Sequence, residues 1–253
     1  VEDVEPVLSE RTRLVATTAA SNLIGTRPPV RQISEAVHRV GALHWVDGVH
    51  ATAHASVDLV ALKADFWTCS PYKFMGPHCG VLAASPELLE TLHPDKLLPS
   101  SDDVPERFEL GTLPYEALAG ATAAVDFIAG LDDAASGTRR ERIERSMAAV
   151  HTHERALLDV LEPGLRGLPG VTVHSNAAKR TPTLLFTVEG RDPQEIRSLL
   201  AERGVNAPAG HFYAIECSRH LGLGDVGGVR VGLAPYTSAE DVDRLVTGLR
   251  EIL

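Results

Sequence analysis

Two residues with complementary chemistry follow predicted strands in the first half of the chain. Asp47 lies in VDGVH (46–50), just past a buried strand, and Lys73 lies in CSPYKFMGPHCG (69–80), in the turn after another. The carboxyl ends of neighbouring strands are where α/β sheets place their ligands. We therefore expect both residues to serve one site, where apolar neighbours of Lys73 favour the neutral amine that attacks an aldehyde.

This pair suits pyridoxal 5'-phosphate (PLP), which needs a lysine for a Schiff base and a carboxylate that keeps the ring nitrogen protonated. Ser70 and Tyr72 add hydroxyl groups beside the amine, and the chain offers few other amines. Its four lysines are Lys63, Lys73, Lys96 and Lys179. Each residue also has an ordinary structural role, because Asp-Gly commonly makes a turn and a lysine in a turn is commonly solvated. The residues alone leave both interpretations open.

The composition excludes several classes of protein. With 253 residues, 44% of them hydrophobic, the chain can bury a core without disulfides. Its net charge of −10 opposes nucleic-acid binding, and no apolar run approaches the roughly 20 residues of a membrane helix. The acidic start VEDVEPVLSERTR differs from a signal peptide, and the three cysteines suggest neither a disulfide framework nor a metal site. We expect a cytoplasmic protein with no nucleic-acid or membrane partner.

Short apolar runs alternate with a helical pattern in the first half, which favours a largely parallel α/β sheet. The predicted strands are 13–21, 42–48, 65–70 and 80–85, with a helix over 29–41. Two helices follow, over 114–130 and 138–161. After Pro169, strands and helices restart as an α+β pattern, and Ser238 with Asp241 predicts a capping box at the last helix. We expect one domain over residues 1–135 and another over residues 136–253.

Four segments at compatible spacings resemble the cysteine desulfurase-like branch of the class V aminotransferases, which are PLP enzymes of fold type I. The segments are TTAASNLIGTRPPV (17–30), GALHWVDGVHATAHASVDLVALKADFWTCSPYKFMGPHCGVL (41–82), RFELGTLPY (107–115) and VRVGLAPYTSAEDVDRLVTGL (229–249). The resemblance implies the C-terminal part of a PLP-binding large domain, a C-terminal α+β domain and a homodimer. Relatives usually carry a further N-terminal segment, which supplies a phosphate loop and a ring-stacking residue; this chain lacks it.

The resemblance also implies roles for the residues around the predicted sheet edge. Lys73 holds the cofactor as a Schiff base, Asp47 faces the pyridine nitrogen, and His50 lies next to the phenolic oxygen of the ring. These three are the expected catalytic residues. Ser70 and Tyr72 match the family's Ser-x-His-Lys pattern, with Tyr in place of His, and are expected to bind the phosphate.

Three further residues receive roles from the same resemblance. Asn22 approaches the phenolic oxygen and the substrate carboxylate, Thr112 reaches the phosphate of the neighbouring subunit, and Arg230 binds the substrate's α-carboxylate. Ordinary roles are open for each. Asn22 could stabilise a bend, Ser70 and Thr112 could cap turns, and Arg230 could pair with the acidic last helix.

The expected reaction is cleavage of a C–S bond in cysteine or a cysteine derivative. In AGHFYAIECSRHLGL (209–223), Phe212 and Tyr213 stand where relatives with a GHHCA-like motif have His and Cys, and Cys217 lies nearby. Helical spacing predicts a short turn over residues 216–220 that holds Cys217 by packing. We therefore favour a lyase over a persulfide-forming desulfurase.

Two alternatives remain at this point. The same scaffold supports epimerisation or transamination, because removal of the Cα proton is common to all these reactions. A catalytically incomplete domain that serves dimerisation or sulfur relay is the other alternative, favoured by the absent N-terminal segment.

Overall fold

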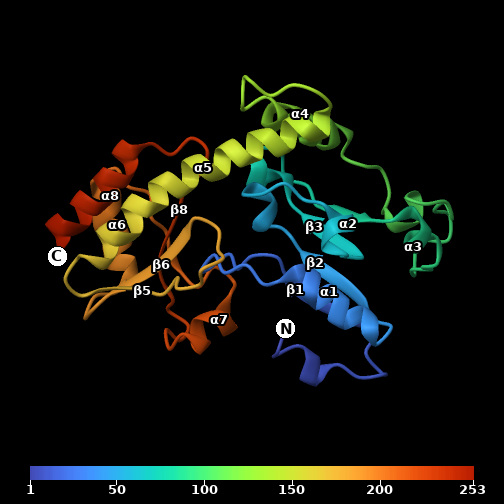
Figure 1. Cartoon of the computed structure of the whole chain (residues 1–253), viewed down its shortest axis with the longest axis horizontal. Coiled ribbons are helices and arrows are strands. Elements are labelled where there is room, and N and C mark those ends of the chain that lie inside the picture. Colours follow the sequence, from blue (N-terminus) through green and yellow to red (C-terminus); the bar gives the residue numbers. More distant parts are fainter. The chain divides into compact units, whose positions relative to one another are not determined.

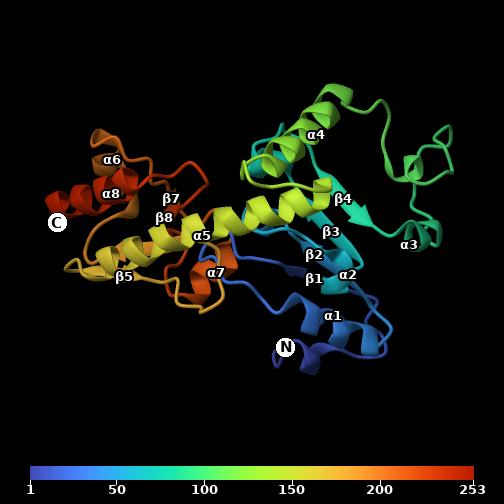
Figure 2. The ribbon, with the colours of Figure 1, turned by 45° about the horizontal axis from the view of Figure 1, so that its top comes forward.

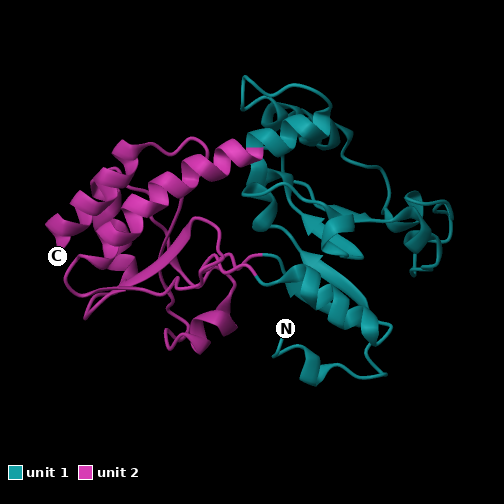
Figure 3. Ribbon diagram, in the orientation of Figure 1, with its two compact units in different colours: residues 1–19, 28–146 teal, residues 20–27, 147–253 magenta.

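The computed structural model describes residues 1–253 and divides them into two compact units (Figure 3). Unit 1 comprises residues 1–19 and 28–146, and unit 2 comprises residues 20–27 and 147–253. The second division falls inside the long helix α5 (Arg139–Arg166). These compact units differ from the two domains expected over 1–135 and 136–253, and the domain assignment itself stays a prediction.

Unit 1 contains a four-stranded sheet in the order β1-β2-β3-β4, whose strands are labelled in Figure 2. The strands β1 (Leu14–Thr18), β2 (Leu43–Asp47) and β3 (Phe66–Cys69) are parallel, and β4 (Val81–Ala84) is antiparallel to β3. The α1 helix (Val30–Arg39) packs an apolar face against this sheet, with Ile33, Val37 and Ala42 at its centre. The predicted mostly parallel α/β sheet is confirmed.

Short elements connect the strands of unit 1 and follow its sheet. They are η1 (Glu5–Val7), η2 (Ala51–Ala53), α2 (Leu59–Leu62), η3 (Pro71–Phe74), α3 (Pro86–Glu90), η4 (Glu106–Phe108) and α4 (Tyr115–Ala129). The α4 helix packs against η3 and the segment that follows it. A Cβ added at Gly120 of α4 would lie 3.1 Å from Pro77 of that segment. The small residues of α4 therefore allow close approach to the chain that carries Lys73.

Unit 2 contains an antiparallel sheet in the order β5-β6-β8-β7. Its strands are β5 (Val171–Val173), β6 (Thr183–Val188), β7 (Ala209–Gly210) and β8 (Gly228–Gly232), and its further helices are α6 (Pro193–Glu202), α7 (Ile215–His220) and α8 (Ala239–Ile252). The α6 and α8 helices lie side by side (Figures 1 and 2) and share one core with β6 and the end of α5. The predicted capping box of Ser238 and Asp241 begins α8. None of the helices combines the length and apolar composition needed to cross a bilayer.

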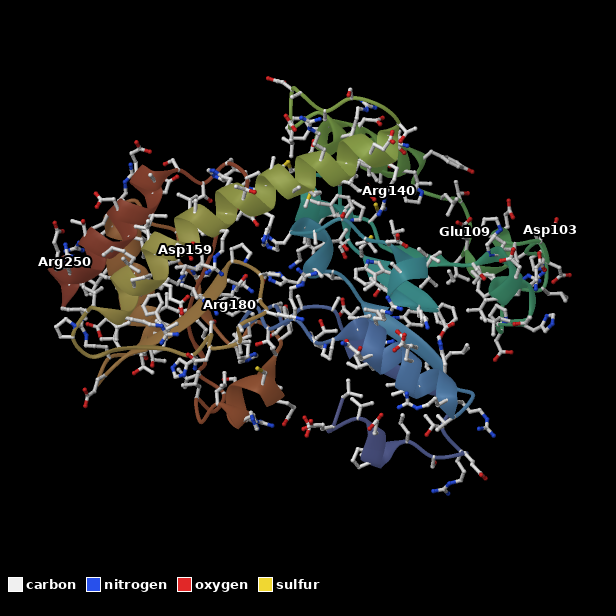
Figure 4. The ribbon with its side chains drawn as sticks, in the orientation of Figure 1. Asp103, Glu109, Arg140, Asp159, Arg180 and Arg250 are labelled. Atoms are coloured by element: carbon white, nitrogen blue, oxygen red, sulfur yellow. The ribbon has the colours of Figure 1, made fainter.

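The segment 20–27, which links β1 to α1, belongs to unit 2 because it pairs with residues 179–181. Arg27 N–H donates to the Lys179 carbonyl and Thr181 N–H donates to the Gly25 carbonyl, both at 2.9 Å. Gly25 has φ +73°, and a Cβ there would lie 2.9 Å from the Thr181 carbonyl oxygen. Arg180, labelled in Figure 4, bonds Glu162 of α5. This pairing fixes the place of Asn22 within unit 2.

A buried histidine joins three elements of unit 1. His44 of β2 is fully buried, with Nδ1 2.7 Å from the Ser34 hydroxyl of α1 and Nε2 2.8 Å from the Thr17 hydroxyl of β1. The Ser34 hydroxyl donates to the Val30 carbonyl, so it accepts from Nδ1–H and leaves Nε2 to accept from Thr17. Burial lowers the pKa of His44 below its ordinary 6.5, against an opposing effect of Asp65.

The turn after β2 is held by a tryptophan. Trp67 of β3 is buried, and its Nε1–H donates to the Thr52 hydroxyl at 3.1 Å, while that hydroxyl donates to the Gly48 carbonyl at 2.8 Å. A Cβ added at Gly48 would lie 2.0 Å from the indole ring. The absence of a side chain at Gly48 therefore lets Trp67 pack beneath the turn that carries Asp47 and His50.

We expect the free energy of unfolding to fall as the pH drops below 6.5, because the unfolded chain protonates His44 while the folded chain resists protonation. The His44→Gln variant should show a smaller fall, whatever its stability at neutral pH. Urea unfolding between pH 5 and pH 8 measures both slopes. The control is His220→Gln, which removes an exposed histidine in unit 2. An unchanged slope in His44→Gln would contradict the assignment.

The Gly48→Ala variant should lose about 1–3 kcal/mol of unfolding free energy, because overpacking forces the indole or the turn to shift. Gly80→Ala is the matched control, since a Cβ there meets nothing within 4 Å. Chemical denaturation of both variants measures the difference. Equal stability of the two proteins would show that the Trp67 ring moves aside without cost.

Candidate active site

Asp47 lies at the carboxyl end of β2, between the ends of two parallel neighbours. It is in register with Thr18 of β1 and Thr68 of β3. Its side chain is exposed, and Oδ1 accepts from the Val49 N–H at 2.9 Å. This bond orients the carboxylate at the sheet edge without using its charge in an ion pair.

His50 follows the same turn and is half-buried at the start of η2. Its ring packs against His54 in an edge-on arrangement, with ring centroids 5.2 Å apart. The turn held by Trp67 and Thr52 thus carries both the carboxylate and an imidazole. The structure brings these two predicted residues together.

Lys73 lies in η3, one turn of 3-10 helix that begins after Ser70. Lys73 N–H donates to the Ser70 carbonyl at 2.9 Å, and Nζ lies 5.4 Å from the centroid of the Tyr72 ring. The Tyr72 ring in turn stacks on His78, with centroids 4.9 Å apart. Because β2 and β3 are adjacent, η3 lies at the same sheet edge as Asp47.

The expected apolar enclosure of Lys73 is wrong. Side chains three residues apart share one side of a 3-10 helix, so Pro71, which is buried, and Phe74, which is half-buried, take the inner side. Tyr72 and Lys73 are left exposed, and Met75 is exposed as well. The residues of this turn therefore present the amine to its surroundings.

Ser70 and Thr112 differ in their setting. Ser70 is half-buried at the start of η3, and its hydroxyl makes no capping bond to the helix. Thr112 is exposed in the segment between η4 and α4, three residues after Glu109, which Figure 4 labels. Both hydroxyls are open to a ligand, and the structure brings only Ser70 to the turn that carries Lys73.

Asn22 and Arg230 meet within unit 2, although 208 positions separate them in the sequence. Arg230 of β8 is half-buried, and its Nη1–H donates to the Asn22 carbonyl at 2.8 Å. The Asn22 side-chain amide donates to the Phe212 carbonyl at 2.8 Å, and the centroid of the Phe212 ring lies 3.8 Å from the guanidinium carbon of Arg230. Burial lowers the pKa of Arg230 from its ordinary value. Arg230 forms no ion pair with an acidic residue of α8, so the alternative in which it pairs with the last helix is not observed.

Cys217 lies in α7, which confirms the predicted short helical turn. Its side chain is half-buried, and burial raises the pKa of the thiol, while a hydrogen bond with Ser21 acts in the opposite direction. A thiol with a raised pKa supplies little thiolate at neutral pH. Tyr213 is fully exposed, and no group of His, Cys, Asp and Glu residues is arranged to hold a metal ion.

Sequence reasoning missed the supporting role of two aromatic residues. Trp67 reads as an ordinary core residue of a strand, and only the Asp-Gly that follows the neighbouring strand hints at the space it fills. Phe212 has no sequence signal for its contact with Arg230. It occupies a turn position with φ 51°, where glycine or asparagine is usual.

Comparisons with known proteins identify the family of this chain. The Aminotransferase class-V family model matches residues 1–245. A probable cysteine desulfurase of Halalkalibacterium halodurans is 31% identical, with 99% of this chain and 61% of the relative covered. A cysteine desulfurase of Pectobacterium carotovorum subsp. carotovorum is 30% identical, with 100% and 61% covered. This chain thus spans about three fifths of the length of these curated relatives.

Solved structures give the same result. The cysteine desulfurase CsdA of Escherichia coli superposes with a TM-score of 0.84 at 26% identity, over 98% of this chain and 61% of that one. The apo cysteine desulfurase of Thermococcus onnurineus gives 0.85 at 26% identity, over 99% and 62%. Family model and fold agree along nearly the whole chain, which belongs to the class-V aminotransferase family.

Proposed function

We propose that the protein containing this chain is a PLP-dependent enzyme that cleaves the C–S bond of cysteine or a cysteine derivative. One observation carries the proposal: Asp47 and Lys73 lie at the carboxyl ends of adjacent parallel strands, exposed at one sheet edge. The cysteine desulfurases among the relatives support it, and so does the use of PLP in the class-V aminotransferase family.

The residues at the sheet edge of unit 1 fit PLP by their chemistry. An exposed amine suits the aldehyde, a carboxylate suits the pyridine nitrogen, and the open hydroxyls of Ser70 and Tyr72 suit the phosphate. When bound, PLP supplies an electron sink for negative charge at the substrate's Cα. Lys73 would have two tasks, to hold the cofactor and to move the proton at the substrate's Cα.

Asp47 keeps a proton on the pyridine nitrogen, since an ionised carboxylate stabilises the positive charge beside it. The Val49 N–H holds the carboxylate in place for this contact. His50 donates or accepts a hydrogen bond at the phenolic oxygen. Thr112, which is exposed, is assigned to the phosphate of a second subunit.

Arg230 binds the α-carboxylate of the substrate, with Asn22 beside it. Nη1 is used by the Asn22 carbonyl, whereas Nε and Nη2 have no protein acceptor and are not sealed in the interior. These two nitrogens point the same way and can make two parallel bonds to a carboxylate. The substrate is therefore an amino acid with a free α-carboxylate.

A lyase fits the surroundings of Cys217 better than a persulfide-forming desulfurase. Its thiol lies in a helix and has a raised pKa, and Tyr213 cannot accept sulfur. A lyase converts cysteine and water to pyruvate, ammonia and sulfide, whereas a desulfurase leaves alanine. Product analysis also separates epimerisation and transamination. A homodimer and a cytoplasmic location stay predictions from the sequence.

The Lys73→Ala variant of the full-length protein should lose covalent attachment of PLP and fall to background activity, because the other lysines lack this setting. Borohydride reduction followed by peptide mass spectrometry locates the modified lysine in the parent. Lys63→Ala is the matched control, since Lys63 is also exposed in unit 1 but pairs with Glu35 at 3.0 Å. PLP fixed at Lys63, Lys96 or Lys179 would contradict the assignment.

Replacement of Cys217 by Ser should leave sulfur release from cysteine within about twofold of the parent, because a thiol with a raised pKa is a poor acceptor. Sulfide and pyruvate are measured together, and the parent is analysed by mass spectrometry during turnover. Near-total loss of sulfur release, together with one extra sulfur on Cys217 in the parent, would establish a desulfurase instead of a lyase.

A further inference from the structure

The turn before α7 has an unusual backbone for its residues. Phe212 has φ 51° and Tyr213 has φ 64°, and the Ala214 N–H donates to the His211 carbonyl at 2.8 Å. Two successive central residues with positive φ are typical of a mirror-image turn, which favours glycine and asparagine. Bulky side chains at both positions are strained, and such strain persists only where the surroundings hold it.

The surroundings hold Phe212 and not Tyr213. The Phe212 carbonyl accepts from the Asn22 side-chain amide at 2.8 Å, and the guanidinium carbon of Arg230 lies over the Phe212 ring, 3.8 Å from its centroid. Arg230 Nη1–H donates back to the Asn22 carbonyl at 2.8 Å, which closes a ring of three contacts. The Tyr213 side chain is fully exposed, although its backbone has the same strain.

These contacts fix which part of Arg230 is available. The guanidinium carbon lies over the Phe212 ring, and Nη1–H donates to the Asn22 carbonyl. Nε and Nη2 remain, as the adjacent pair that binds a carboxylate with two bonds. A flexible arginine without the ring could turn its fork in several directions, because its side chain has many rotamers.

We propose that Phe212 is a positioning residue, which holds the Arg230 fork so that Nε and Nη2 face the substrate's α-carboxylate. The proposal rests on the proposed function, in which Arg230 receives that carboxylate. It gives the strained turn a purpose, since Phe212 in its left-handed conformation contacts Asn22 through its carbonyl and Arg230 through its ring.

The test compares two probes in the full-length, PLP-loaded protein. 3-Mercaptopropionate carries a carboxylate, and 3-mercaptopropionamide has the same shape without the charge; neither has the amine needed to displace Lys73. Phe212→Leu should weaken binding of 3-mercaptopropionate by roughly 2- to 30-fold, the range of a cation–π contact, and leave the amide unchanged. Isothermal calorimetry measures both dissociation constants.

Matched variants separate positioning from a structural role. Tyr213→Leu removes a ring from the same strained turn but from no contact, and should change neither dissociation constant. Phe212→Tyr, which keeps the aromatic ring, should bind 3-mercaptopropionate as tightly as the parent. With cysteine, Phe212→Leu should raise KM by a similar factor and change kcat by less than twofold.

Several outcomes would overturn the proposal. Binding of 3-mercaptopropionate within twofold of the parent in Phe212→Leu would do so, and equal weakening of both probes would indicate a structural role. If Phe212→Leu does not fold, Phe212→Gly and Tyr213→Gly, which both relieve the strain, give the same comparison. Arg230→Gln tests the carboxylate site separately: if it binds 3-mercaptopropionate as the parent does, Arg230 does not bind the carboxylate, and both assignments fail.

Discussion

The close approach of Gly25 to Thr181 is the constraint on which the arrangement of unit 2 depends. A side chain at Gly25 would collide with the Thr181 carbonyl oxygen and hydroxyl, and the backbone there is left-handed. Only glycine meets both demands at no cost. Because this contact is allowed, residues 20–27 pair with residues 179–181 and Asn22 reaches Arg230. Asn22 and Arg230, which lie far apart in the sequence, thus come together in one candidate binding site.

The two sets of candidate residues are held by different means. In unit 1, strand register places Asp47 and the start of η3. The buried indole of Trp67 supports the turn that carries Asp47. Backbone hydrogen bonds therefore do most of the positioning there. In unit 2, Arg230 depends on a side-chain amide, a carbonyl and an aromatic face. Such a set is more sensitive to substitution, since each contact belongs to a single side chain or turn.

The sequence allowed the parallel strands, the long helices and the capping box of Ser238 to be predicted, because each has a local signal in apolar spacing or turn residues. The placement of Asp47 and Lys73 at the ends of neighbouring strands was predicted from the alternation of apolar runs and helical patterns. The exposure of Lys73 could not be read in this way. Its apolar neighbours suggested enclosure, but the 3-10 geometry directs Pro71 inward and Lys73 outward. The contact between Phe212 and Arg230 is non-local and depends on a backbone conformation that its residues disfavour.

The buried His44 of unit 1 constrains which substitutions this sheet can accept during evolution. A neutral imidazole has one donor and one acceptor, and His44 uses them on Ser34 of α1 and Thr17 of β1. Loss of either hydroxyl leaves a buried polar nitrogen unpaired, which costs more than the bond itself contributed. Replacement of all three by apolar residues of similar size avoids that cost. We therefore expect positions 17, 34 and 44 to covary: a substitution at one of them destabilises the fold, whereas joint replacement of all three does not.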